Sequence, residues 1–133
     1  MNITLEQAET VIAAAKRKSI EINTKMVISV LDAGTNLVAL ARMDDALLGS
    51  IDVSIKKAKT SALLQMDTAT LTPLVKPEGP FFNLEHSNGG LITFAGGVVI
   101  KNSAGIVIGA VGVSGGSLED DHIVAEAGAK AVL

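Results

Sequence analysis

Two histidines are the residues of this chain best suited to ligating a metal or to moving a proton near neutral pH. His86 lies in an irregular, glycine-rich segment, and His122 follows the acidic run 119–121. They are not spaced as a metal-binding pair on one element. His86 is interpreted either as a solvated loop residue or as a metal ligand or polar group of a pocket. His122 is interpreted either as a partly buried, hydrogen-bonded residue at a helix start or as a ligand.

The acidic run before His122 offers a second kind of chemistry. Carboxylates at a helix start interact favourably with the helix dipole, and this effect alone accounts for Glu119, Asp120 and Asp121. The alternative is that Glu119 or Asp121 faces a pocket lined by Gly115 and Gly116, where a carboxylate can take or give a proton. The sequence identifies no second carboxylate to pair with it.

Basic residues could hold an anionic group. Arg42 and Asp44 stand two positions apart at the end of a predicted strand. They form either an ion pair, or Arg42 is an anchor for a ligand carboxylate. We expect Lys56, Lys57 and Lys59 to be solvated, because a helix on the surface needs a polar face. The alternative is that one of them is a second anchor for the anionic group. A lysine that forms a Schiff base would have to be buried, and the sequence does not indicate such burial.

The elements that position these residues begin with a helix and a hairpin. Thr4 and Gln7 match a capping box, and apolar residues at helical spacing follow, so we predict a helix from Leu5 to about Glu21. Segment 26–31 is apolar and β-branched, and segment 37–42 returns after a glycine-containing turn. Together they predict an antiparallel hairpin.

The second half of the chain is predicted to contain two longer helices, an irregular segment and three strands. One helix starts at Gly49-Ser50 with Ser50 as its cap. A short helix or turn, ended by prolines, follows at 68–74. Segment 76–90 is long for a simple connection, and such loops are often functional. Strands are predicted at 91–94, 98–100 and 106–114, and the last helix at 118–132.

Composition excludes several classes of protein. The 133 residues suit one domain with its own core, and the absence of cysteine excludes disulfides and thiolate chemistry. A net charge of −3 and only three aromatic residues, all Phe, argue against a nucleic-acid surface. No apolar run is long enough to span a membrane, and the polar N-terminus does not resemble a signal peptide. These features predict a cytoplasmic protein.

The most distinctive stretch is residues 107–121, with the sequence VIGAVGVSGGSLEDD. Gly109 and Gly112 remove side chains from a predicted buried strand, so another backbone or a flat ligand can approach closely. Gly115 and Gly116 allow a sharp turn, and Ser117 suits a helix cap. The stretch resembles the end of the GlcG/HbpS/PduO-C-terminal-domain family, whose members are known as haem-degrading or haem-binding proteins.

Other parts of the chain are similar to the same family in the same order. They are the first strand and turn at 27–34, the second strand with its R-x-D ending at 42–44, the lysine-rich helix at 52–61, and Phe94-Ala95-Gly96-Gly97 before a central strand. The resemblance implies one domain over residues 1–133 with a profilin-like α+β fold, in which a five-stranded antiparallel sheet lies between helices as α/β/α layers. It also implies a homo-oligomer, with dimers that build into a larger ring or octamer.

The resemblance further implies a small-molecule ligand, with haem or a related tetrapyrrole as the first candidate. The site would lie where segment 76–90 meets Gly96-Gly97 and segment 112–117. Lys18 stands where an N-terminal-helix histidine would be needed, so the metal ligand would be His86, His122 or a residue other than histidine. The full set of candidate cofactor-binding residues is Arg42, His86, Phe94, Gly96, Gly97, Gly115 and His122.

Two other functions stay open from the sequence. In one, the chain is an accessory protein or enzyme acting on a small organic acid or a diol-pathway metabolite, with Glu119 or Asp121 as general acid or base and Arg42 binding the substrate carboxylate. In the other, it is a structural oligomerising module without a ligand site.

Overall fold

A four-stranded antiparallel sheet forms the middle layer of the molecule. The computed structural model describes residues 1–132. The strands lie in the order β2-β1-β4-β3, and every neighbouring pair is antiparallel. Their bounds are Val27–Asp32 for β1, Leu37–Arg42 for β2, Gly97–Lys101 for β3 and Val107–Ser114 for β4. The predicted hairpin is confirmed as β1 and β2.

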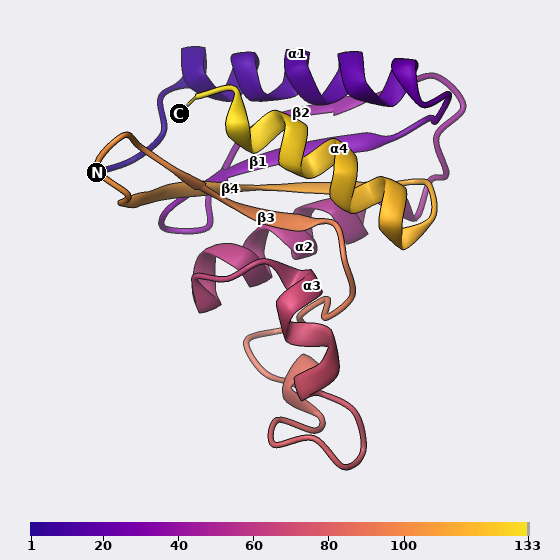
Figure 1. Cartoon of the computed structure of the whole chain (residues 1–133), viewed down its shortest axis with the longest axis vertical. Coiled ribbons are helices and arrows are strands. Elements are labelled where there is room, and N and C mark those ends of the chain that lie inside the picture. Colours follow the sequence, from indigo (N-terminus) through magenta and orange to yellow (C-terminus); the bar gives the residue numbers. More distant parts are fainter. Residues whose placement is uncertain (133) are drawn as a thin grey trace.

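Helices cover both faces of this sheet, which confirms the expected α/β/α layers. Helices α1 (Leu5–Glu21) and α4 (Leu118–Lys130) lie together on one face, and α2 (Ser50–Leu64) lies on the other (Figure 1). Helix α3 (Thr68–Leu71) and two 3₁₀ turns at 72–74 and 84–86 lead into an arm that projects away from the sheet on the α2 side (Figure 1). None of the helices formed by residues 1–132 is both long and apolar enough to cross a membrane.

The expected fifth strand at 91–94 is not formed, and this prediction was wrong. The backbone of this segment bonds to groups outside the sheet. The amide of Leu91 donates to the Glu85 carbonyl, the amide of Ile92 to the Thr60 hydroxyl, and the Thr93 carbonyl accepts from Thr72. Because these groups are already paired with the arm and with α2, the segment connects the arm to β3 without joining the sheet.

The larger core lies between the sheet and the pair α1 and α4. Alternation along β1 places Ile28 and Val30 in this core, whereas Leu31 packs on the opposite side with Ala58 of α2. Helix α1 begins as predicted, because the Gln7 amide donates to the Thr4 hydroxyl and the Thr4 amide donates to the Gln7 side chain. The two N-terminal bonds fix where the helix starts.

Helix α2 approaches the sheet through small side chains. The Ser54 and Ser29 hydroxyl oxygens lie 2.7 Å apart, and a Cβ added at Gly112 would overlap the Ser54 carbonyl oxygen. Ser50 is the first residue of the helix and its side chain provides no cap, so the predicted capping role was wrong. Its hydroxyl is instead hydrogen-bonded to Ser114, at 3.0 Å. A larger side chain along this contact would push the helix off the sheet.

Gly112→Ala tests this close approach. We expect the substitution to lower the free energy of unfolding by about 1–3 kcal/mol, because the new methyl group must displace α2 backbone. Gly49→Ala is the matched control, since a Cβ there meets nothing within 4 Å and we expect a change below about 1 kcal/mol. Urea denaturation followed by circular dichroism measures both. Equal stability of the two variants would contradict the assigned contact.

Candidate functional site

A buried ion pair joins helix α2 to helix α4. The Lys57 Nζ lies 2.8 Å from Asp121 Oδ2, and the two side chains are 0% and 3% exposed. The ammonium also donates to the Val113 carbonyl at 2.9 Å and lies 5.1 Å from the centre of the Phe94 ring. The expectation that Lys57 is solvated was therefore wrong. Its register in α2 places it, with Ser54 and Ser61, on the buried side of the helix.

Burial and pairing act in opposite directions on this ion pair. Burial lowers the pKa of Lys57 and raises the pKa of Asp121, and the attraction and hydrogen bond between the two groups oppose both shifts. The second carboxylate oxygen, Asp121 Oδ1, accepts from the Gly116 amide at 2.9 Å. Both oxygens of Asp121 are thus engaged by the protein itself, whereas Glu119 is exposed at the start of α4.

The glycines predicted to make room for a ligand are instead packed against other parts of this chain. A Cβ at Gly96 would lie 2.5 Å from Lys57 Nζ, and one at Gly97 would lie 2.5 Å from the Lys57 carbonyl oxygen. A Cβ at Gly115 would overlap the Lys25 carbonyl. Phe94 is 37% exposed and places its ring beside the buried ammonium. These residues therefore let α2 and the β4 turn pack closely.

Neither histidine lines a surface hollow that Arg42 lines. His86 is exposed at the end of the 3₁₀ turn 84–86 in the arm, on the side of the sheet opposite to α1 (Figure 1). His122 lies in α4 with its Nε2 3.4 Å from Glu126 Oε2. Its buried Nδ1 has no hydrogen-bond partner among the described residues. Of the residues expected in one site, Arg42 and Gly115 line the two adjoining hollows described below, whereas His86, Gly96, Gly97 and His122 line neither.

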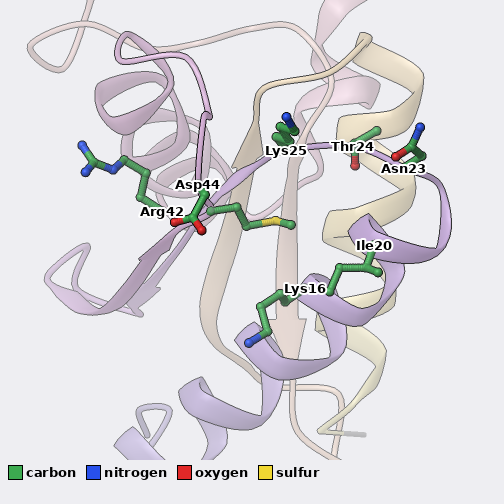
Figure 2. Close-up of a pocket in the computed structure, with 8 residues that line it drawn as sticks. Lys16, Ile20, Asn23, Thr24, Lys25, Arg42 and Asp44 are labelled. Atoms are coloured by element: carbon green, nitrogen blue, oxygen red, sulfur yellow. The ribbon is translucent and has the colours of Figure 1, made fainter.

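Arg42 lines a surface groove of about 450 Å³. The end of α1, the connection to β1 and the end of β2 form its walls (Figure 2). Three basic residues and one acidic residue line it, and Figure 2 shows the Arg42 guanidinium directed away from Lys16 and Lys25. No ion pair formed among residues 1–132 includes Arg42. The lining residues are Lys16, Ile20, Asn23, Thr24, Lys25, Arg42, Met43 and Asp44.

A second hollow, of about 550 Å³, continues this groove. Both share the lining segment 23–25, and the second extends past Asp45 and Leu47 to Gly115 and Gly116. Lys25 Nζ lies 3.6 Å from Asp45 Oδ2 on its rim. The second hollow therefore adjoins the groove at residues 23–25 and reaches the glycine turn that Asp121 holds. The prediction of a site at Arg42 missed Lys16 and Lys25, because only the fold brings them beside β2.

In chemical terms, the groove offers exposed cations for an anionic group and few groups for metal ligation. Within residues 1–132, no three His, Asp or Glu side chains are grouped so that they could hold a metal ion. Fold and groove together define a three-layer α+β domain with a cationic surface groove beside a buried Lys–Asp pair. The sequence model of the family "Haem degrading protein HbpS-like" matches residues 3–130, and the chain belongs to this family.

Relatives in sequence include proteins of enteric bacteria. The chain is 43% identical over 126 residues to an uncharacterized 15.0 kDa protein of the dhaT-dhaS intergenic region of Citrobacter freundii, covering 93% of this chain and 87% of that protein. It is 34% identical over 133 residues to the corrinoid adenosyltransferase PduO of the same organism, covering 99% of this chain but 39% of PduO. Protein GlcG of Escherichia coli K12 is 34% identical over 112 residues, with 84% and 81% coverage.

Two solved structures show the same fold. Klebsiella pneumoniae protein ORFY superposes with a TM-score of 0.94 at 37% identity, covering 98% of this chain and 90% of that one. A PduOC:heme complex superposes with a TM-score of 0.93 at 32% identity, covering 99% and 96% of the two chains. A member of this fold has therefore been solved with haem.

Lys57→Met tests the electrostatics of the buried pair. The variant leaves Asp121 buried without its cation, and we expect a loss of about 3–5 kcal/mol in the free energy of unfolding near neutral pH. Without Lys57, only burial and its neighbours act on the carboxyl, so the pKa of Asp121 rises further above its ordinary value of 3.8. When the pKa of a carboxyl is higher in the folded state, the group does not reduce stability at a pH below its unfolded-state pKa. The free energy of unfolding then falls as the pH rises through the folded-state pKa.

We therefore expect the deficit of Lys57→Met to be smallest in acid and to widen towards neutral pH, measured by denaturation at several pH values. Lys56→Met is the control, because Lys56 pairs with Asp52 on the surface at 3.0 Å and its loss should change stability by less than about 1 kcal/mol. A deficit that does not change with pH would contradict the buried charge.

Proposed function

We propose that this chain binds a small anionic molecule in the groove at Arg42, with haem or a related tetrapyrrole as the first candidate. The observation that carries the proposal is the arrangement of Lys16, Lys25 and Arg42 around one groove. An arginine fork suits a carboxylate, and two lysines can hold a second anionic group. Ile20, which is 62% exposed, supplies apolar surface beside them.

The basic residues of the groove carry the charge needed to hold the carboxylates at the edge of a haem. Arg42, Lys16 and Lys25 would hold those groups, and the haem would supply a redox-active iron. The Met43 sulfur is engaged within the protein, because it lies 3.4 Å from the Met26 amide. The PduOC:heme complex, with 32% identity, supports haem as the first ligand to test.

The proposed axial ligand is His86 of a neighbouring copy. Neither histidine lines the groove of its own chain, whereas His86 is exposed in an arm that projects from the body (Figure 1). Phe81 and Phe82 are 50% and 51% exposed in the same arm, and exposed aromatic residues are typical of contact surfaces. The proposal therefore includes a homo-oligomer, in which dimers build a larger ring or octamer.

A small organic acid is the second candidate ligand, and the isolation of Arg42 from both histidines favours it. A short carboxylate needs one guanidinium and no metal ligand. In that case the chain would act as an accessory protein or enzyme, with the exposed Glu119 as the carboxylate open to solvent. A structural module without any ligand is the third possibility that the experiments distinguish.

Titration of the purified protein with hemin tests the groove. We expect a saturable shift of the Soret band at one hemin per chain, and Arg42→Ala should weaken binding about tenfold because a charge-assisted hydrogen bond is lost. Arg17→Ala is the matched control, since Arg17 is exposed on α1 outside the groove. Added salt should weaken binding to the wild type. Equal binding by both arginine variants would place the ligand elsewhere.

Spectra of His86→Ala and His122→Ala identify the axial ligand. We expect the Soret position of the ferric complex to change in His86→Ala and to stay unchanged in His122→Ala. A change confined to His122→Ala would transfer the ligand role to α4. A hemin response that never saturates would exclude haem, and a rise in melting temperature with short hydroxy or keto acids would then support the organic acid.

A further inference from the structure

We propose that Asp121 is a positioning residue, which fixes the Gly115-Gly116 turn as one wall of the ligand groove, with Lys57 holding the carboxylate in place. The inference rests on the proposed function, because the groove it concerns is the proposed ligand site. It assigns the buried pair a task in binding as well as in stability.

The contacts of Asp121 link the buried pair directly to the groove. Its Oδ1 accepts from the Gly116 amide at 2.9 Å, and Gly116 lines the hollow that continues the groove. Gly115 has φ +142° and lies so close to Lys25 that a Cβ would overlap the Lys25 carbonyl. Lys25 lines both hollows. A displacement of the turn therefore also displaces the backbone of Lys25.

Lys57 fixes the same turn from its other end. Its ammonium bridges the Val113 carbonyl, at 2.9 Å, and Asp121 Oδ2, at 2.8 Å. Val113 precedes the turn along the chain and Asp121 follows it, so the lysine closes segment 113–121 into a loop. The Ser117 hydroxyl, which accepts from the Asp120 amide at 3.1 Å, fixes the start of α4 within that loop. Every anchor of the turn is thus buried or is a helix cap.

A wall that is fixed before the ligand arrives reduces the entropy lost on binding. The groove itself consists mostly of exposed side chains at the ends of α1 and β2. The turn 115–116, which lines the adjoining hollow, is tied to a fully buried charge. For this reason we expect loss of the Gly116 bond, rather than loss of the ion pair as such, to weaken ligand binding.

Two double variants separate the bond from the ion pair. Lys57→Met/Asp121→Asn and Lys57→Met/Asp121→Leu both lack the buried charges, and replacing both partners of such a pair is often tolerated. Only the asparagine variant keeps a side-chain oxygen that can accept from the Gly116 amide. We expect the asparagine variant to bind hemin within about threefold of the wild type and the leucine variant about tenfold more weakly.

Hydrogen exchange of the Gly116 amide, followed by NMR without ligand, provides an independent measurement. We expect slow exchange in the wild type and in the asparagine variant, and at least about tenfold faster exchange in the leucine variant. Circular dichroism establishes that the variants fold, and Lys57→Met/Asp121→Ala replaces the leucine variant if that one does not.

Equal exchange rates in the two double variants, or faster exchange with unchanged hemin affinity, would overturn the positioning role. If the wild type itself does not bind hemin, the proposed function fails. The exchange rates then decide by themselves whether Asp121 fixes the turn.

Discussion

The buried Lys57–Asp121 pair is the constraint on which the arrangement of the layers depends. Helices α2 and α4 lie on opposite faces of the sheet (Figure 1), yet the ammonium of one meets the carboxylate of the other at 2.8 Å. Two charges removed from water destabilise a fold unless each finds its partners in good geometry. Here the partners come from α2, β4 and α4, so these three elements must be in place together before either charge is satisfied.

The close contact of α2 with the sheet makes this arrangement possible. A lysine reaches a carboxylate on the far layer only if its own helix lies low over the strands. Gly112 and Ser54 permit that approach, and Gly96 leaves room for the ammonium. The side of α2 that faces the sheet is consequently rich in small polar residues. The hydroxyls of Ser50 and Ser54 bond to serines of the sheet, and this pairing offsets the cost of burying them. The buried Ser61 hydroxyl has no hydrogen-bond partner among the described residues.

Local signals in the sequence predicted most of the elements. The capping box of Thr4 and Gln7, the hairpin and the Ser117 cap each depend on residues a few positions apart, and the structure has all three. Long-range partners were the cause of the errors. Lysine side chains are usually solvated, and the partner that allows Lys57 to be buried, Asp121, is 64 positions away in the sequence. Segment 91–94 is apolar enough for a strand, but its amides are taken by Glu85 and Thr60.

The candidate site shows the same division between local and long-range information. Arg42 was identified from its own chemistry at a strand end, whereas Lys16 and Lys25 join it only because α1 packs beside β2. The sequence suggested Asp121 as an acid or base, but both of its carboxylate oxygens are hydrogen-bonded within the protein. In the proposed function, such a carboxylate would contribute through the backbone it holds. The exposed cations would attract the ligand, and the buried pair would keep the adjoining turn rigid.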